Sequence, residues 1–359
     1  MTAKPNRIFV SHGPGETRCA LVEDETVLEA VFIRDAEAQT GAVYAGQVTE
    51  RAPGSADMFV DIGIAPHGLL ETKGQKFTGG QLIAVEVVAS ARADKGHKLK
   101  IAALPANVSK PGLIQAAPHP VLVWWKAYGH TLDEVVVERA RKAMTQLLGP
   151  DATVVESAAN ELTFAEIDEQ IDAALEATVH LPGGGRVIFE STSALTAVDI
   201  DAGSSDIAQA NSEAMSAIAQ HMRLRNLAGH IVVDLIHTKG KMRFVEQLKE
   251  LCASDPVDTR IMGLTPSGMI DIVRQRVRPS LAETLLNDET TAYRALRLAA
   301  RELVVQRTAR VELKVAPHVA ALLNEKLKAA LTEARDVAKG EIRITPETTF
   351  AANRIEVSA

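Results

Sequence analysis

The chain has 359 residues, of which 46% are hydrophobic and 24% are charged, so we expect two or three domains with sizeable apolar cores. The net charge of −7 argues against a generic nucleic-acid binder, although local basic patches are compatible with it. Cys19 and Cys252 lie far apart in no Cys/His cluster, which argues against a cysteine-ligated zinc site and an oxidising compartment. No apolar run approaches the length of a membrane span, and the N-terminus contains no signal-peptide core. We therefore expect a cytoplasmic protein with no membrane partner.

The first third of the chain is predicted to be rich in β-strands. Short β-like runs are separated by Gly, Pro and polar residues, at 7–12, 17–23, 27–35, 41–51, 56–63, 67–71 and 81–91. The close spacing of the runs between 41 and 104 is typical of a small barrel of the OB type. Residues 120–125 are then predicted to form a buried strand.

Helical patterns begin at Thr131. Residues 131–149 carry an N-cap, an early acidic turn and a final Gly, which predicts a helix. A second helix is predicted at 163–179. A turn and strand follow at 181–190, and a further strand at 194–201 is a candidate hairpin partner for it.

Strands and helices alternate from residue 206 onward. We predict a helix at 206–227 capped by Asp206, a strand at 230–236, a helix at 242–254, a strand at 259–264 and a helix at 265–276. This alternation predicts an α/β layer with partly parallel strands. The last unit is predicted as a small α/β domain with helices at 291–306 and 317–337 and strands at 308–315, 341–346 and 352–358.

Acidic residues lie near the ends of two apolar strands. Alternate residues of a strand share a face, so Asp199 and Asp201 point to one side while Val198 and Ile200 point to the other. Asp234 lies in an otherwise aliphatic predicted strand, near its C-terminal end, where burial would make a lone carboxylate costly. There it would border the crevice in which α/β sheets bind ligands. If the two strands are neighbours, Asp199 and Asp234 can share a hard cation, and oxygen-only ligands favour Mg²⁺ or Mn²⁺.

A divalent ion held in this way can activate water and stabilise the charge on an attacked phosphate. The alternative for each carboxylate, taken singly, is a solvated surface residue or a helix cap, and this is the more frequent case. Two separate strands that each end in an acid after aliphatic residues weaken that alternative only modestly. Spacing alone therefore nominates a site without identifying a function.

Arginines follow the carboxylates in pairs. Arg223 and Arg225 close the predicted helix before the strand of Asp234, and Arg274 and Arg276 close a later predicted helix. Cations are favourable at the negative ends of helices, and the same residues are candidates for contact with phosphate. Both explanations stay open from the sequence.

Two features of the β-rich segment are candidates for contact with nucleic acid. Phe59 is expected in the barrel core, with a base-stacking platform as the alternative. Residues 92–100 are basic and contain a Gly, so they form either a solvated hairpin tip or an edge of the barrel that follows a nucleic-acid backbone.

Taken in order, these pieces resemble the ribonuclease E/G family of bacterial endoribonucleases. The resemblance is most specific over about residues 190–281, in the motifs STSALTAVDIDAGSSD, NSEA, MRLRNLAGHIVVDLI, VEQLKE and IVRQRVRPSL. GAVYAGQV, MFVDIG, HGLL and DKG are similar to the OB-fold domain of that family, and ALLNEKLKAAL is similar to its small C-terminal domain.

The resemblance implies an α/β (α+β multidomain) architecture. It divides the chain into a ribonuclease-H-like subdomain at 1–38 and 106–180, an inserted OB-fold RNA-binding domain at 39–105, a DNase-I-like catalytic subdomain at 181–285 and a small C-terminal α/β domain at 286–359.

The resemblance also implies an activity. The Mg²⁺-binding aspartates of the family fall on Asp199 and Asp234, with Asp201 beside them, and its RNA-contacting aromatic and basic residues fall on Phe59 and Lys95. Family members cleave single-stranded RNA, often AU-rich, by metal-assisted hydrolysis that leaves a 5′-phosphate on the downstream product. We therefore expect a Mg²⁺-dependent endoribonuclease of RNA processing or decay, with Mn²⁺ as the alternative ion.

The chain departs from the family pattern at several positions. Asp201 stands where Asn is usual, Ser193 where Glu is usual, His237 where a second acid is common, and Leu69 where a second RNA-contacting aromatic is expected. The segment that senses a 5′-monophosphate is missing after KPGLIQ, so we expect cleavage that does not depend on 5′ phosphorylation. The zinc-link cysteines are also missing, so no structural zinc is expected, and a homodimer without a zinc bridge stays open.

Two further hypotheses come from the same residues. One is a non-catalytic RNA-binding protein on a degenerate nuclease scaffold, motivated by the changes at Ser193, Asp201 and His237. The other is a nuclease that acts on DNA. Both aspartates that the family requires are present, so we rank the endoribonuclease first.

Overall fold

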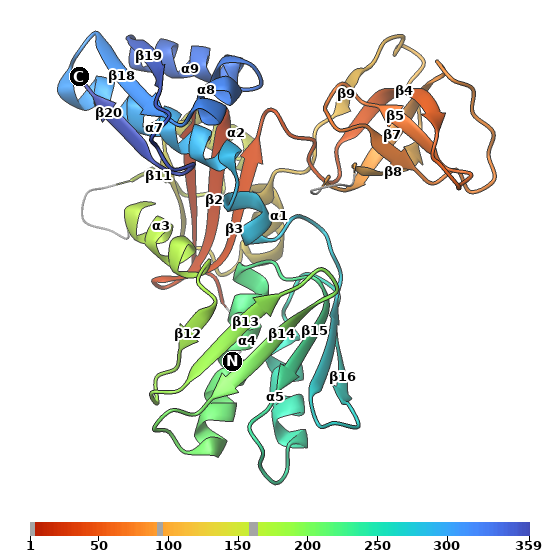
Figure 1. Ribbon diagram of the computed structural model, residues 1–359, viewed down its shortest axis with the longest axis vertical. Coiled ribbons are helices and arrows are strands. Elements are labelled where there is room, and N and C mark those ends of the chain that lie inside the picture. Colours follow the sequence, from red (N-terminus) through yellow and green to blue (C-terminus); the bar gives the residue numbers. More distant parts are fainter. Residues whose placement is uncertain (1–3, 92–95, 158–163) are drawn as a thin grey trace.

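The computed structural model describes residues 4–91, 96–157 and 164–359. Within these residues the strands form four sheets. A central sheet lies in the middle of the molecule, a barrel stands to one side of it, a second sheet with two helices lies below, and a small C-terminal unit lies above (Figure 1). None of the helices in the described part combines the length and the apolar character that crossing a membrane requires.

The central sheet is built from two distant parts of the chain. Its order is β11-β10-β1-β2-β3, with β1 (Arg7–Gly13), β2 (Glu16–Glu23), β3 (Thr26–Arg34), β10 (Glu134–Glu138) and β11 (Val154–Glu156). The helices that pack on it are α1 (Pro120–Tyr128), α2 (Arg141–Leu148) and α3 (Phe164–Ala173). Successive residues of β1 enter different cores: Ile8 and Val10 pack with Trp124 of α1, whereas Phe9 packs with Ile167 of α3.

Two sequence predictions in this region are wrong. Residues 120–125 form a helix rather than a buried strand, because Pro120 opens its first turn, His119 caps it, and the buried Val121 and Trp124 are three residues apart. The predicted helix at 131–149 is a strand followed by a shorter helix. Its β-branched run pairs in parallel with β1, and this distant pairing overrides the local helical pattern.

The barrel closes on itself. Its strands are β4 (Val43–Arg51), β5 (Met58–Asp61), β6 (Gly68–Leu70), β7 (Leu82–Ala89), β8 (Lys98–Ala102) and, paired to β4, β9 (Gly112–Gln115). The hydrogen-bonded ring runs β4-β5-β6-β8-β7 and returns to β4, which fits the expected OB fold. A Cβ on Gly68 would lie 2.3 Å from the Leu99 side chain, so only glycine fits at this position of β6 beside the barrel core. Because β9 joins the sheet, the barrel sheet extends beyond the expected boundary at residue 105.

The second six-stranded sheet has the order β12-β13-β14-β15-β17-β16. Its strands are β12 (Thr178–His180), β13 (Arg186–Ser191), β14 (Leu195–Asp201), β15 (Gly229–Asp234), β16 (Thr259–Leu264) and β17 (Ile270–Arg274). The helices α4 (Ile207–Leu224), capped by Asp206 as predicted, and α5 (Met242–Cys252) supply its core with Met215, Ile218 and Phe244. β12 belongs to this sheet, so the expected division between residues 180 and 181 cuts through its edge.

The predicted helix at 265–276 is also wrong, because these residues contain β17. Ile270, Ile272 and Arg274 are buried and the residues between them are not, which is the period of a strand. β17 pairs antiparallel with both β15 and β16. The hydrogen bonds to β15 and β16 make this segment a strand, whereas its short apolar run was compatible with either a helix or a strand.

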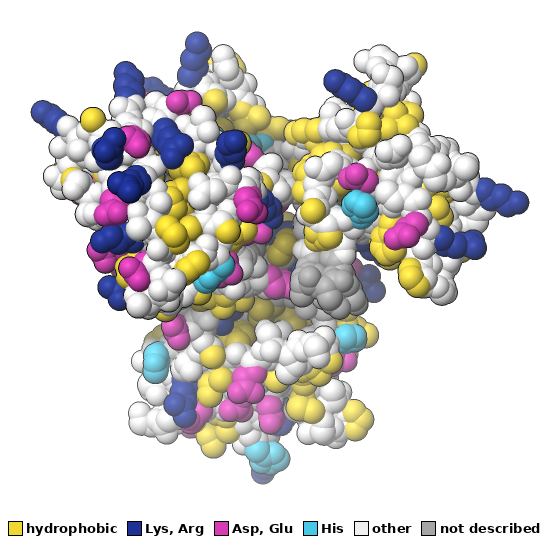
Figure 2. Space-filling view, turned by 45° about the horizontal axis from the view of Figure 1, so that its top comes forward, with side chains coloured by type: hydrophobic (Ala, Val, Ile, Leu, Met, Phe, Trp, Pro, Cys, Tyr) yellow, Lys and Arg dark blue, Asp and Glu magenta, His cyan; other side chains and the backbone are white. Residues whose placement is uncertain are grey.

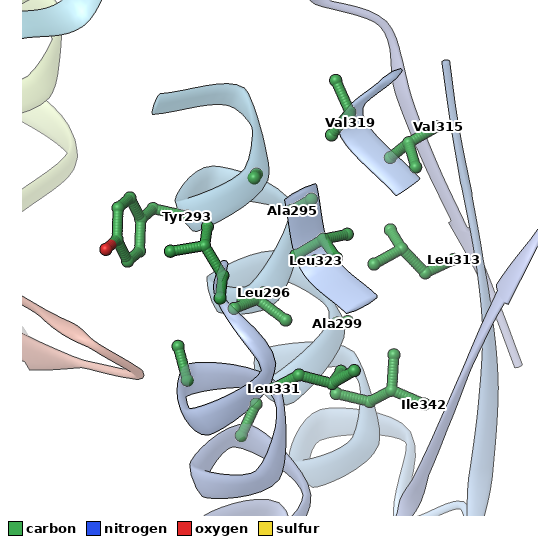
Figure 3. Close-up of a cluster of buried hydrophobic side chains, with 14 of the residues drawn as sticks. Tyr293, Ala295, Leu296, Ala299, Leu313, Val315, Val319, Leu323, Leu331 and Ile342 are labelled. Carbon is green, nitrogen blue, oxygen red and sulfur yellow. The ribbon is translucent and has the colours of Figure 1, made fainter. Parts of the chain in front are cut away.

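The C-terminal unit contains α6 (Leu281–Leu285), α7 (Asp288–Gln306), β18 (Arg310–Val315), α8 (Pro317–Asn324), α9 (Lys328–Ala338), β19 (Glu341–Pro346) and β20 (Ile355–Ser358). Helices α7, α8 and α9 pack on one face of the β19-β18-β20 sheet, and Figure 3 shows Leu296, Leu313 and Leu331 in the shared core. The helix expected at 317–337 is two helices, since the chain leaves helical geometry at Glu325 and buries Leu327 before α9 begins.

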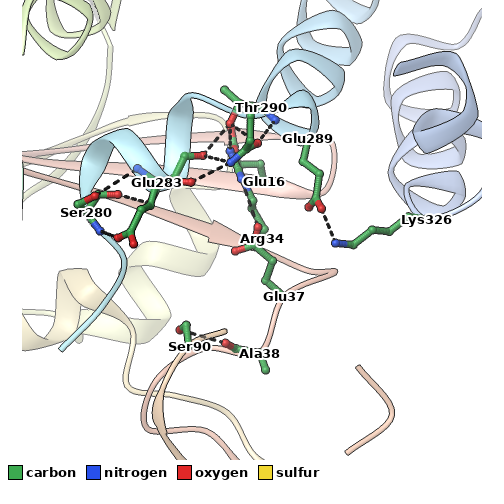
Figure 4. A network of polar contacts seen from close by, with 12 residues as sticks. Glu16, Arg34, Glu37, Ala38, Ser90, Ser280, Glu283, Glu289, Thr290 and Lys326 are labelled. Carbon is green, nitrogen blue, oxygen red and sulfur yellow. Dashed lines mark hydrogen bonds and ion pairs between the residues drawn. The ribbon is translucent and has the colours of Figure 1, made fainter. Parts of the chain in front are cut away.

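A buried ionic cluster joins the C-terminal unit to the central sheet (Figure 4). Arg34 Nε donates to Glu16 Oε2 at 2.8 Å, and Arg34 Nη2 donates to the Thr290 hydroxyl at 2.7 Å. Arg297 of α7 pairs with the other oxygen of Glu16.

The sheets and helices confirm the predicted mixed α/β class. The relationship of individual sheets to ribonuclease H and DNase I stays a prediction.

Candidate active site and nucleic-acid surface

Asp199 and Asp234 lie side by side. β14 and β15 are neighbouring parallel strands, and their register pairs Asp199 directly with Asp234. Neighbouring strands are about 4.8 Å apart, and directly opposed residues point to the same face of a sheet. Both aspartates are at the C-terminal ends of their strands, where open α/β sheets bind ligands. The adjacency that the sequence left open is thus present.

The two carboxylates occupy the face of the sheet that α4 and α5 do not cover. Val198, Ile200 and Val233 alternate with them and are buried in the core on the helical face. Asp199 and Asp234 are exposed, and neither side chain has a hydrogen bond or ion pair with the described residues. Two adjacent carboxylates without a counter-charge repel each other, and a cation between them removes that repulsion.

Asp201 lies on the same face but is already engaged. It forms an ion pair of 2.8 Å with Arg186 on β13 and accepts a hydrogen bond of 2.9 Å from the Gly203 amide. The Gly203 hydrogen bond and then the Arg186 contact lower the pKa of this carboxyl group below its ordinary value. The described residues contain no group of three His, Cys, Asp or Glu side chains able to hold a metal ion. The candidate site is therefore the pair Asp199 and Asp234.

Asp271 on β17 is an acidic neighbour that sequence reasoning missed. It lies opposite Val232 on β15, two residues before Asp234, and so it shares the open face and stands diagonally from Asp234. The prediction of a helix at 265–276 concealed this position. The alternation of Ile270 and Ile272 around Asp271 was the signal that could have revealed it.

Arg223 and Arg225 lie at the end of α4, as expected, but inside the protein. Arg223 Nε donates to Glu29 at 2.7 Å, and its Nη2 donates to the Tyr128 hydroxyl at 3.0 Å. Arg225 lies over the ring of Phe189 and donates to His221 Nδ1, and burial lowers the pKa of Arg225 to about 10. Phosphate contact through Arg223 would require a buried ion pair to break, so the structural role is the better supported one.

Arg274 and Arg276 are also held by carboxylates. Arg274 ends β17 rather than a helix, is 2% exposed, and forms an ion pair of 2.8 Å with Asp255. Arg276 is half-buried and pairs with Glu283 at 2.9 Å. These contacts fix the segment that leaves the sheet towards α6. Arg274 is buried in its ion pair, whereas the Arg276 side chain is 27% exposed and its contact with phosphate stays a prediction.

The outer face of the barrel carries Phe59. The core holds its neighbour Val60, which is fully buried, so alternation places Phe59 on the opposite, outer side rather than in the expected core. Phe59 pairs with Leu69 on β6, and Leu69 pairs with Lys98 on β8. This row of an aromatic, an aliphatic and a basic side chain is called the barrel row below. Lys95 lies outside the described residues.

Charged side chains form local groups on the face that Figure 2 shows. Figure 2 shows Lys and Arg side chains gathered over the C-terminal unit, whereas acidic side chains gather on the lower part of the molecule, which the second six-stranded sheet forms.

Comparison with known proteins agrees with this arrangement. The model of the ribonuclease E/G family matches residues 123–277, which include both β14 and β15. Ribonuclease G of Salmonella typhimurium (strain SL1344) is 29% identical over 216 residues, 54% of this chain and 44% of that protein. Ribonuclease E of Buchnera aphidicola subsp. Acyrthosiphon pisum (strain APS) is 31% identical over 252 residues, 62% of this chain and 28% of that protein.

Ribonuclease E of Escherichia coli (strain K12) is 32% identical over 223 residues, 54% of this chain and 21% of that protein. The chain thus spans less than half the length of these curated relatives. The segment that matches the ribonuclease E/G family model contains both Asp199 and Asp234.

Proposed function

We propose that the protein is a metal-dependent endoribonuclease that cleaves single-stranded RNA. The observation that carries this proposal is the parallel, in-register pairing of Asp199 with Asp234 on an open sheet face. The names of the relatives, ribonuclease G and ribonuclease E, support the same class of reaction.

The donor set fits a hard divalent cation. Asp199 and Asp234 offer only oxygen ligands, and carboxylate oxygens favour Mg²⁺ or Mn²⁺, which keep several water ligands. The absence of a third protein ligand among the described residues is compatible with such an ion. When bound, the ion would supply an activated water and stabilise charge on the phosphate under attack. Asp199 and Asp234 would hold it, and Asp201 would stay with Arg186.

The barrel row is the proposed RNA-binding surface. Phe59 offers a ring on which a base can stack, and Leu69 beside it extends an apolar but weaker platform. Lys98 currently pairs with Glu71 at 2.7 Å, but both side chains are about half exposed. Exposed ion pairs of this kind contribute little, so a phosphate can replace the carboxylate at small cost.

Further properties of the proposed enzyme follow from the family resemblance. Hydrolysis would leave a 5′-phosphate on the downstream product, and the biological setting would be RNA processing or decay. Cleavage would not depend on the phosphorylation state of the RNA 5′ end. Any homodimer would form without a zinc bridge.

The test is cleavage of a labelled single-stranded RNA with Mg²⁺ or with chelator. We expect cleavage that disappears in chelator and in Asp199→Asn and Asp234→Asn. Retention of the RNA without cleavage by the wild-type protein would contradict the proposal and favour the non-catalytic RNA-binding protein. Equal cleavage of DNA of the same sequence would contradict the specificity for RNA.

A further inference from the structure

The chain leaves β15 directly after Asp234, and a buried amide holds it there. Asn211, in the second turn of α4, is fully buried. Its Nδ2 donates to the Ile236 carbonyl at 3.1 Å, and its Oδ1 accepts from the Ile236 amide at 3.2 Å. Ile236 lies beyond the end of the strand, so the Asn211 amide takes the place that a neighbouring strand would fill.

Lys241 contacts Leu235, the residue between Asp234 and Ile236. Lys241 Nζ donates to the Leu235 carbonyl at 3.4 Å and to the Gly268 carbonyl at 3.1 Å. Leu235 follows Asp234 immediately, and Gly268 lies in the turn between β16 and β17. Lys241 therefore ties the chain after Asp234 to the hairpin that carries Asp271.

These contacts constrain a carboxylate that has no partner of its own. Asp234 is exposed and its carboxylate has no hydrogen bond or ion pair with the described residues, so no side-chain contact of Asp234 fixes the orientation of this carboxylate. Asn211 and Lys241 restrain the two residues that follow it. Groups that orient ligands without touching the ion typically change metal affinity by about 10- to 100-fold.

We propose that Asn211 and Lys241 are positioning residues that fix the backbone after Asp234 and thereby set its carboxylate beside that of Asp199 for a divalent cation. The inference rests on the proposed function. Neither residue is proposed to touch the ion or the RNA. The readout is therefore the binding of Mn²⁺ alone to the full chain, followed by electron paramagnetic resonance without RNA.

The first variant is Asn211→Leu, which keeps the number and branching of the side-chain heavy atoms and removes both hydrogen bonds without changing charge. We expect Mn²⁺ affinity about 10- to 100-fold weaker than wild type and faster hydrogen exchange at the Ile236 amide. The matched control is Gln247→Leu, because Gln247 Nε2 donates to the Ser212 carbonyl, one residue from Asn211, and makes no hydrogen bond to Leu235 or Ile236. The control should bind Mn²⁺ as wild type does.

The second variant, Lys241→Met, keeps the test valid if Asn211→Leu fails to fold. Loss of a cation near two carboxylates would by itself strengthen Mn²⁺ binding. Loss of positioning weakens it, by about tenfold. Tighter Mn²⁺ binding by Lys241→Met, or wild-type binding by a folded Asn211→Leu, would overturn the inference and leave the proposed function standing. A wild-type protein that binds no Mn²⁺ would overturn both.

Discussion

The buried carboxylate of Glu29 on the central sheet pairs with Arg223 of α4, which packs on the second six-stranded sheet, and it should be costly to remove. It accepts hydrogen bonds from Arg223 Nε at 2.7 Å, Arg278 Nη2 at 3.0 Å and Trp124 Nε1 at 3.3 Å. Its side chain is 4% exposed and that of Arg223 is 8% exposed. The change Glu29→Ala would leave Arg223 as a buried charge without a carboxylate partner, with only the Tyr128 hydroxyl to accept its hydrogen bond.

The expected loss follows from that burial. Removing one partner of a buried ion pair destabilises a protein by about 3–5 kcal/mol, because the other charge is left uncompensated. The pair between Arg310 and Glu341 has the same shortest distance, 2.7 Å, but its side chains are 65% and 53% exposed. The matched control Glu341→Ala should therefore cost about 0–1 kcal/mol.

The assay is urea unfolding followed by tryptophan fluorescence. Trp124 and Trp125 are the two tryptophans of the chain, both lie in α1, and Trp124 donates to Glu29, so the signal reports on this region. We expect Glu29→Ala to lower the free energy of unfolding several times more than Glu341→Ala. Equal losses in the two variants would refute the assignment of Glu29 as the ionic centre of this junction.

The remaining predictions concern pH, the site and RNA. Burial opposes ionisation of Glu29, but the charges of Arg223 and Arg278 outweigh this effect and lower the pKa of Glu29. The stabilisation by Glu29 is therefore complete above the ordinary pKa of glutamate and is lost as the pH falls through the lowered pKa of the folded state. The unfolding free energies of wild type and Glu29→Ala should thus converge in acid, and a constant gap would contradict this. Asp234→Asn should slow RNA cleavage by more than about 100-fold, which exceeds the loss expected for a residue that only orients a metal ligand. Asp201→Asn should change the rate by less than about tenfold, and initial rates in Mg²⁺ measure both effects. Phe59→Ala should weaken single-stranded RNA binding by about 1–3 kcal/mol in a filter or anisotropy titration, and unchanged affinity would remove the barrel row from the interface. Substrates with 5′-triphosphate and 5′-monophosphate ends should be cleaved at equal rates, and a strong monophosphate preference would show that a 5′ sensor exists.

Local patterns predicted much of the second sheet. The period-two alternation around Asp199, the aliphatic run before Asp234 and the cap at Asp206 each depend on residues close in sequence, and all three elements form as predicted. The register between β14 and β15 is a long-range property, because α4 separates the strands in sequence. The sequence could therefore nominate the two aspartates without showing that they are opposed.

The errors have the same physical origin. The run of Val135 to Val137 was assigned to a helix, but its pairing with β1 comes from residues more than a hundred positions away. The partner of Arg223 is Glu29, 194 residues away in sequence, so its role as a buried ion pair was invisible to local reasoning. For Phe59 the residue pattern alone favoured the core, because the face of a four-residue strand cannot be assigned until the barrel closes, whereas the family resemblance assigned it to the RNA-binding surface.

The most direct test of the aspartate pair is the stoichiometry of Mn²⁺ binding to the wild-type chain and to the variants Asp199→Asn, Asp234→Asn and Asp201→Asn. If Asp199 and Asp234 share one ion, the wild type and Asp201→Asn will each bind one tight Mn²⁺ per chain, and either of the other changes will abolish it. Retention of that ion in the double variant of Asp199 and Asp234 would contradict the proposed metal site.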